Sequence, residues 1–528
     1  MNTFRHIRAA RLLIAAMALF SSSVLFVAES AAADQRPNFL FIIFDDWGWR
    51  DAGAYGCDWV KTPNFDRLAR EGVLFRNCFT SNPKCSPCRA SILTGRNTWQ
   101  LEEAVCHGGL FPAKFAVYPD LLEASGYFVG LTGKGWGPGD FLGGGFKRNP
   151  AGPTFGNHKA NPPANGIGAV DYPANFGDFL KAWPKDQPFS FWMGFNEPHR
   201  AYEPGSGLRA GKKLADVEVP GYLPDTPTVR SDLLDYAIEV EYGDAQIGRA
   251  IAMLEEAGEL DDTLIMVTSD HGMPFPRVKG QIYEDAFHLP LTMRWGNGIK
   301  AGRVVDDFVN VRDFAPTLLE LAGLPVHEQM SGKSLVNVLR SEASGQVDPS
   351  RTVMLAGKER HDLGRPYDWG YPVRAIRTPE YLFSYNYFPD RWPAGNPETD
   401  FGNCDPSPTK ELLKRIGGSF YEMAFGKRPQ RELYKLSDDP WCLRNLATDP
   451  FYAPVALELE TRMLAILREE QDPRALGNGA IFDTYKYLGG RDKAYDTWLM
   501  QIDPPADGTP PPAQMKTKRK GKGKNKGE

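Results

Sequence analysis

The chain of 528 residues is 42% hydrophobic and 24% charged, an ordinary globular balance that excludes a largely disordered or fibrous protein. Its formal net charge is −5, but both ends are basic: residues 1–33 carry +2 and residues 516–528 carry +6, so the body between them carries −13. Such an acidic body argues against nucleic acid as the main partner, so we expect none.

The first predicted element is an export signal in residues 1–33. Arg5, Arg8 and Arg11 precede an apolar run from Leu12 to Ala28, and small residues follow from Ser30 to Ala33. This is the pattern of a cleaved secretory signal peptide; an uncleaved anchor helix is the alternative, although serines interrupt the run. We expect no transmembrane anchor after cleavage. Because the chain has no Asn-x-Ser/Thr sequon, we expect a secreted or periplasmic protein of a bacterial envelope.

Between residues 34 and 345, apolar strand patterns alternate with helical patterns. Strands are predicted at 38–46, before Lys134, before His199 and at 262–272, and helices at 62–72, 231–258 and 312–324, with Thr62 and Ser231 as caps. This alternation predicts an α/β fold with a large, mostly parallel sheet between helices. Ligands bind such sheets beyond the carboxyl ends of the strands. Polar residues follow each predicted strand: Asp45, Asp46, Lys134, His199, Asp270 and His271.

Beyond residue 345 the sequence changes character. Pro, Gly, Tyr and Trp become frequent, short strand-like pieces occur within 373–387, and an amphipathic helix is predicted near 453–470. Residues 346–502 are therefore predicted to form a smaller C-terminal antiparallel α+β subdomain. Residues 503–528 contain a Pro-rich stretch and then a Lys-rich one, which predicts a disordered basic tail.

Two pairs of polar residues point to a metal. Asp45 and Asp46 are adjacent carboxylates, which repel each other unless a cation holds them. Asp270 and His271 occupy the same position after another predicted strand. Three carboxylates and an imidazole favour Ca²⁺ or Mg²⁺, and leave Mn²⁺ or Zn²⁺ open because imidazole is a softer ligand. A solvated or capping pair of aspartates is the alternative.

Seven cysteines occur, at positions 57, 78, 85, 88, 106, 404 and 442. Disulfides are expected in an exported chain. Because seven is odd, at least one thiol must have another role.

The segment CSPCRASILTGR, from Cys85 to Arg96, resembles the signature of the formylglycine-dependent sulfatases, Cys-x-Pro-x-Arg followed by Thr-Gly-Arg. FIIFDDWGW, TSDHG, KGQIYEDAFHLPL and ELYKLSDDPWCLRNLA are similar to other segments of that family, so the resemblance covers nearly the whole chain after residue 33. It implies an alkaline-phosphatase-like sulfatase fold with the catalytic domain over 34–345. It also implies that a formylglycine-generating enzyme oxidises Cys85 to formylglycine (3-oxoalanine).

The resemblance further implies the roles of single residues. Ca²⁺, with Mg²⁺ or Mn²⁺ also possible, is held by Asp45, Asp46, Asp270, His271 and the modified Cys85. The hydrated aldehyde at residue 85 then attacks sulfur. Lys134 and Lys279 neutralise sulfate oxygens, Arg89 orients residue 85, and His199 donates a proton to the leaving group. A helix expected to start near Pro87 adds N–H groups that face the anion.

One position departs from the family pattern. Trp136 stands where sulfatases commonly carry the histidine of a Lys-x-His pair. The base that takes the second hydroxyl's proton is therefore open among four residues: His107, His158, His288 and His361.

The segments NEPHR, VPGYLPDTPTVRSDLLDY, DHGMPFP and YPVRAIR resemble the N-sulfoglucosamine sulfohydrolase (sulfamidase, heparan N-sulfatase) branch. This implies a sulfated glucosamine as in heparan sulfate, a glycosaminoglycan, with His361 and Arg374 in the substrate pocket. Lys279, where that branch carries Arg, leaves an O-sulfatase acting on another sulfated polysaccharide open. Three further functions stay open: a phosphonate or phosphodiester hydrolase of the same superfamily, a glycan-binding protein with unmodified Cys85, and a redox protein using Cys85 and Cys88.

Overall fold

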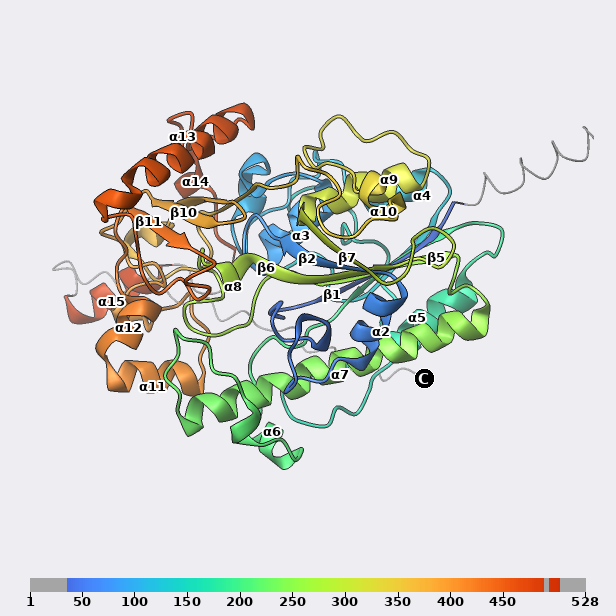
Figure 1. The fold of residues 1–528 in the computed structure, drawn as a ribbon, viewed down its shortest axis with the longest axis horizontal. Coiled ribbons are helices and arrows are strands. Elements are labelled where there is room, and N and C mark those ends of the chain that lie inside the picture. The colour runs from blue at the N-terminus through green and yellow to red at the C-terminus, as the bar shows by residue number, and fades with distance from the viewer. Residues whose placement is uncertain (1–35, 489–492, 504–528) are drawn as a thin grey trace, which may run out of the picture. The chain divides into compact units, whose positions relative to one another are not determined.

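The strand predicted from NFLFIIF lies inside a seven-stranded sheet of the computed structural model, which describes residues 36–488 and 493–503 (Figure 1). All of these except Arg36 and Pro37 belong to the compact unit Asn38–Glu528. In spatial order the strands are β3 (Phe128–Gly133), β4 (Phe189–Gly194), β1 (Asn38–Phe44), β5 (Thr263–Ser269), β6 (His288–Arg294), β2 (Val73–Phe79) and β7 (Arg303–Asn310). Only β6 runs against the others, so the predicted mostly parallel sheet is confirmed.

Alternate side chains of β1 feed two hydrophobic layers, because successive residues of a strand face opposite sides of the sheet. Leu40, Ile42 and Phe44 pack towards one set of helices, and the residues between them pack towards the other. Figure 1 shows these sets on the two faces of the sheet: α2 (Pro63–Glu71), α5 (Tyr172–Ala182) and α7 (Pro227–Ala257) below, and α3 (Cys85–Thr94), α4 (Tyr118–Ala124), α9 (Phe314–Leu321) and α10 (Val336–Arg340) above. The short helix α6 (Ser206–Arg209) packs on α7.

Helix starts differ from the prediction at two places. The long helix α7 begins at Pro227, and the Thr226 hydroxyl, instead of Ser231, accepts a hydrogen bond from the N–H of Val229. Proline at the first helical position after a threonine is a strong start signal, so Ser231 lies inside the helix. Helix α3 begins at Cys85, two residues before Pro87.

The predicted C-terminal antiparallel subdomain is confirmed as a four-stranded sheet with flanking helices. Its strands, in spatial order, are β11 (Arg431–Lys435), β10 (Tyr381–Asn386), β9 (Val373–Arg377) and β8 (Met354–Lys358). The remaining helices are α8 (Glu284–Phe287), α11 (Pro408–Ile416), α12 (Gly418–Phe425), α13 (Ala453–Glu469), α14 (Ile481–Thr484) and α15 (Ala494–Ile502). Helix α13 packs against β9 and β10 and corresponds to the amphipathic helix expected near 453–470.

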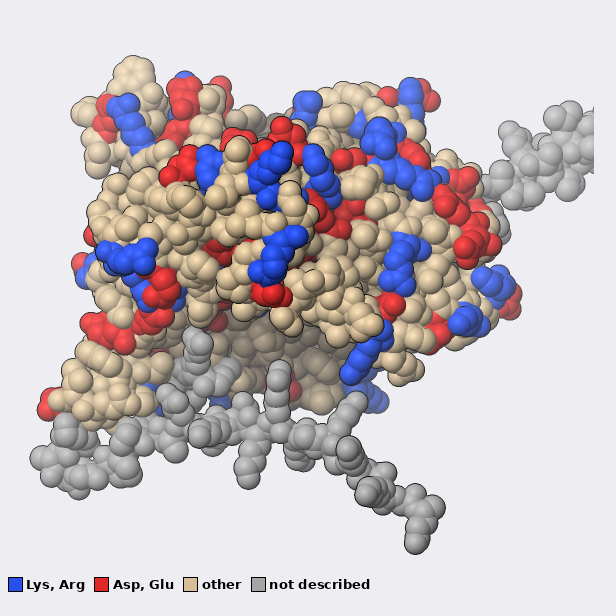
Figure 2. Space-filling view, turned by 90° about the horizontal axis from the view of Figure 1, so that it is seen from below, with Lys and Arg blue, Asp and Glu red and all other residues tan. Residues whose placement is uncertain are grey.

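The expected disulfides are absent: all seven cysteines, which lie within the described residues, are unpaired. The physical reason is their distribution, since most of them are spread over separate packing clusters, with Cys106, Cys404 and Cys442 in three different ones. No helix in the described part is long and apolar enough to cross a membrane. The predicted signal segment and all but the first residue of the predicted tail lie outside the described residues. On the side of α7, Figure 2 shows basic and acidic side chains interspersed.

Candidate active site

The polar residues predicted after β1 and β5 meet at one edge of the sheet. The two strands are parallel neighbours, with Phe44 opposite Ser269, so the residues that follow them emerge together. Asp45, Asp46, Asp270 and His271 are all buried, at 0–2% exposure. The N–H of Asp46 donates a hydrogen bond to the Asp270 carboxylate (3.2 Å), which joins the two strand ends.

Each of the three carboxylates gives one oxygen to a cation from another segment. Lys279 Nζ binds Asp46 at 2.7 Å, Arg89 Nε binds Asp270 at 2.9 Å, and Lys134 Nζ binds Asp45. Among the described residues, the second oxygens of Asp45 and Asp46 are buried and accept no hydrogen bond. A buried carboxylate oxygen without a donor is costly, and a metal ion removes that cost.

The ring of His271 is held in the orientation of a metal ligand. Its Nδ1 contacts the carbonyl oxygen of Gly272 (3.0 Å), and because that oxygen only accepts, Nδ1 carries the proton. Nε2 then points to the cluster, 2.9 Å from Asp46 and 3.4 Å from the sulfur of Cys85. One ligand atom each from Asp45, Cys85, Asp270 and His271 lies within 4.8 Å of the others. This donor set fits a divalent cation.

Electrostatics in the cluster agree with a missing positive charge. Burial, helped by the charge of Asp45, raises the pKa of Asp270 to about 7. Burial also acts against ionisation of Asp45, but Lys134, His199 and Arg89 outweigh it and hold the pKa of that carboxyl well below its usual range. Three carboxylates this close ionise together only when more cationic charge is present.

Cys85 is the first residue of α3, completely enclosed beside the carboxylates. Burial and Asp45 raise the pKa of its thiol, but Lys134 and His271 more than offset them and lower it. Cys88, one turn later, belongs to the hydrophobic core, where burial raises its thiol pKa well above the usual value. The two sulfurs therefore sit in different environments and are not paired.

A chain of three side chains, of which the sequence predicted only the histidine, approaches Cys85. His107 Nδ1 lies 2.7 Å from Asp362, and the other oxygen of Asp362 binds Lys84 at 2.6 Å. Because Nδ1 is engaged, the buried Nε2, which has no other partner among the described residues, faces the Cys85 thiol. Burial lowers the pKa of His107, but Asp362 outweighs it and raises the pKa.

His199 lies on the other side of the cluster, with Nδ1 at 2.6 Å from the carbonyl oxygen of Arg200. A nitrogen of its ring lies within 4.8 Å of carboxylate oxygens of Asp46 and Asp405. Asp405, which sequence reasoning missed, also binds Lys279 at 2.8 Å. No sequence periodicity marks Asp405, because it comes from the irregular segment between β10 and α11.

The two residues expected in the substrate pocket have different surroundings. His361 Nε2 contacts the side-chain oxygen of Asn82, and its buried Nδ1 has no partner in the described part of the chain. Arg374 is 1% exposed and already bonded to Asp472 (2.8 and 3.0 Å) and Glu359 (2.8 Å). The structure therefore places Arg374 in a buried ion-pair network.

The remaining histidines considered as the base do not face Cys85. His158 is exposed and paired with Asp178 (2.7 Å), and His288 lies between Glu284 and the carbonyl of Arg76. Trp136 is buried, and its indole N–H donates to the carbonyl of Ser86 (3.0 Å) in the first turn of α3.

The fold and the site define an α/β enzyme whose sheet edge carries a buried carboxylate, imidazole and thiol cluster ringed by fixed cations. Residues 37–324 match the family described as Sulfatase. Human N-sulphoglucosamine sulphohydrolase is 29% identical over 490 residues, covering 83% of this chain and 91% of that protein. An ulvan-active sulfatase of Formosa agariphila is 24% identical over 483 residues, covering 81% and 74%.

Solved structures agree with this fold. A protein in complex with its substrate D-glucosamine-2-N,6-O-disulfate superposes with a TM-score of 0.61 at 20% identity, covering 83% of this chain and 98% of that one. The chain belongs to the sulfatase family and is a sulfuric ester hydrolase.

Proposed function

We propose that this sulfatase removes sulfate from a sulfated amino sugar of the N-sulfoglucosamine type, with Cys85 converted to formylglycine and Ca²⁺ as the cation. The observation that carries the proposal is the set of inward-facing carboxylate oxygens beside a buried cysteine at the start of α3. When bound, the cation and the modified residue supply a nucleophile at neutral pH. Mg²⁺ and Mn²⁺ satisfy the same donors less specifically.

The fixed cations prepare the site for an anion. Lys134 and Lys279 are held at the rim of the cluster by Asp45, Asp46 and Asp405, so their positive charges are already in place when a sulfate group arrives. Preorganised charge of this kind is often the largest catalytic contribution. Arg89, 0% exposed, fixes Asp270 and thereby the strand end that carries His271.

Two histidines serve proton transfer in this proposal. His199 holds a proton at the ring nitrogen near Asp46 and Asp405 and gives it to the leaving group. His107 accepts a proton at Nε2, next to residue 85, while Asp362 orients its ring through Nδ1. His107 thus fills the role left open by Trp136.

The substrate class rests on the relatives and on the rim of the site. N-sulphoglucosamine sulphohydrolase and the glucosamine-disulfate complex both involve sulfated glucosamine by their names. Asp405 is 25% exposed beside His199, where a carboxylate can accept hydrogen bonds from an amine or hydroxyl of a sugar. An O-sulfatase acting on another sulfated polysaccharide uses the same cluster and is the second candidate.

The test is sulfate release from N-, 2-O-, 3-O- and 6-O-sulfated glucosamines, by protein co-expressed with a formylglycine-generating enzyme. Release from the N-sulfated sugar alone supports the proposal, and release from an O-sulfated sugar supports the second candidate. Faster hydrolysis of a phosphonate ester contradicts both. Peptide mass spectrometry showing unmodified Cys85 in active protein contradicts the proposed nucleophile. We also propose export to the periplasm or medium, which amino-terminal sequencing of the mature protein tests.

A further inference from the structure

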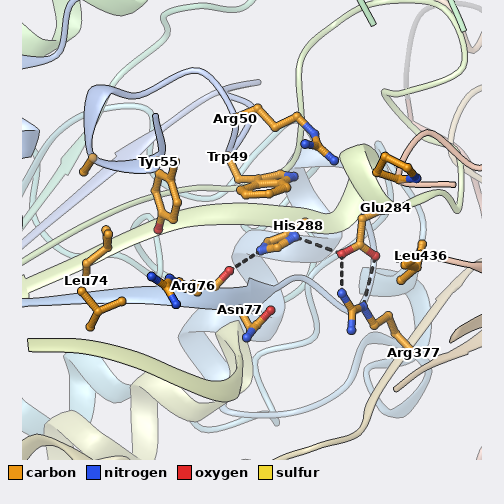
Figure 3. A pocket seen from close by; sticks show the side chains of 13 residues that line it. Trp49, Arg50, Tyr55, Leu74, Arg76, Asn77, Glu284, His288, Arg377 and Leu436 are labelled. Carbon is orange, nitrogen blue, oxygen red and sulfur yellow. Dashed lines mark hydrogen bonds and ion pairs between the residues drawn. The ribbon is translucent and has the colours of Figure 1, made fainter. Parts of the chain in front are cut away.

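A second cavity lies beside the catalytic cluster and uses none of the cluster's residues. It has a volume of about 530 Å³ and is lined by residues from the loop after β1, from β2, α8, β6 and β9, and from the segment after β11 (Figure 3). We call it the Arg76 pocket; its lining includes Trp49, Arg50, Arg76, Glu284, His288 and Arg377. Its volume falls in the range of small-molecule sites.

The lining of the Arg76 pocket is positive in a chain that is otherwise acidic. Three arginines and one glutamate line it, which gives a formal charge of +2, whereas the whole chain carries −5. A cleft lined by one sign of charge attracts ligands of the opposite sign. The lining therefore selects an anion.

Not all three guanidinium groups are available to a ligand. Arg377 is consumed by Glu284, which it binds through two nitrogens at 2.9 and 3.2 Å, and by the carbonyl of Thr378. Arg76, in contrast, has a 61% exposed side chain and a single 3.3 Å contact with Asp306. Its remaining N–H donors face solvent or the pocket.

Arg50 is held rigidly with donors to spare. Its guanidinium lies 4.4 Å from the ring centre of Trp49 and 4.2 Å from that of Trp441, and only its Nε is bonded, to Asp285 at 3.0 Å. Trp49 in turn stacks on His288 at 4.1 Å, and Figure 3 shows Trp49 between Arg50 and His288. This stack fixes the side chain before a ligand binds, which lowers the entropic cost of binding.

The Arg76 pocket also lies close to the catalytic cluster. Trp49 follows Asp46 by three residues, and three residues of chain span at most about 11 Å. A saccharide chain with one sulfated unit at Cys85 therefore has neighbouring units within reach of the pocket.

We propose that the Arg76 pocket binds a second sulfated saccharide unit of the substrate chain, held by Arg50 and Arg76. This inference rests on the proposed function for the chemistry of its ligand. It adds that the substrate is an oligosaccharide or polymer and that affinity for it depends on residues away from the reacting group. Guanidinium groups bind the oxygens of sulfate through charge-assisted, often paired hydrogen bonds.

The test measures binding of a heparin-derived hexasaccharide by calorimetry, with Cys85→Ser in the full chain so that no turnover occurs. Arg76→Glu should raise Kd about tenfold, the effect of losing one charge-assisted contact. The matched control is Arg209→Glu, because Arg209 is similarly exposed (56%) and pairs with Glu203 outside the pocket. A chemically desulfated hexasaccharide should bind at least tenfold more weakly than the sulfated one.

In the active enzyme, Arg76→Glu should leave kcat/KM for p-nitrophenyl sulfate within twofold. An unchanged hexasaccharide Kd in Arg76→Glu overturns the inference, and so does an equal loss in Arg209→Glu. A loss confined to Arg76→Glu supports the pocket even if the active enzyme releases no sulfate from N-sulfoglucosamine, an outcome that refutes only the proposed function.

Discussion

Replacement of His107 by alanine tests the proposed proton acceptor directly. The Nδ1 of His107 is anchored to Asp362 at 2.7 Å, and its Nε2 faces Cys85. A positioned general base contributes about 10²–10⁴-fold to rate, which equals about 3–5 kcal/mol of activation free energy. We therefore expect kcat to fall by that factor, whereas KM changes little because His107 does not pair with the sulfate-facing lysines.

The assay is steady-state sulfate release from a sulfated glucosamine, with and without added imidazole. Imidazole should restore part of the kcat of His107→Ala, because a small base can enter the space that the side chain leaves. Peptide mass spectrometry must show the same formylglycine content as in the unmodified enzyme, which separates catalysis from maturation. A kcat within threefold of the starting value, at equal formylglycine content, would refute the role of His107.

Three further changes probe the rest of the molecule. Asp46→Asn removes one inward-facing oxygen of the cluster, so calcium affinity measured by calorimetry should fall at least tenfold and activity should be lost; retained affinity would contradict the assigned metal site. Arg374→Met leaves Asp472 buried without its partner, so the free energy of unfolding should drop by about 3–5 kcal/mol in urea titrations; an unchanged stability, or lost activity in stable protein, would point to a substrate role instead. Asp51→Asn removes a buried carboxyl whose pKa burial raises to about 7. Because the folded state keeps a proton that the unfolded state releases near pH 4, wild-type stability should decrease between about pH 4 and 7, and the variant should gain up to about 4 kcal/mol above pH 7. Parallel pH profiles of the two proteins would contradict this.

Strand-end reasoning placed the metal cluster correctly because parallel strands constrain geometry strongly. Once β1 and β5 were recognised as buried strands, the polar residues after them had to emerge at one edge of the sheet. Lys134 and Arg89 follow the same logic, since one ends β3 and the other begins the helix after β2. The periodicity of the sequence therefore contained most of the cluster.

The partners that come from irregular segments were not predictable in this way. Asp362 and Asp405 lie in loops of the C-terminal half, more than 250 residues from Cys85, and only the packing of the two sheets brings them to it. Lys84 stands directly before Cys85 in the sequence, but its pairing with Asp362 depends on that packing. Arg374 carried a family match, yet a charged side chain in the middle of β9 needs buried partners, and Asp472 and Glu359 provide them.

Trp136 explains why the proton acceptor comes from a different element in this chain. Its indole packs on Phe111 (ring centres 5.0 Å apart) and donates to the carbonyl of Ser86, so it stabilises the first turn of the helix that begins with Cys85. A 3% exposed indole fills the space that a polar ring would need there. The imidazole is instead supplied by the loop that carries His107, where Asp362 and Lys84 satisfy its second nitrogen and compensate its charge. A family position occupied by tryptophan thus changes the origin of the base without removing an imidazole from the neighbourhood of residue 85.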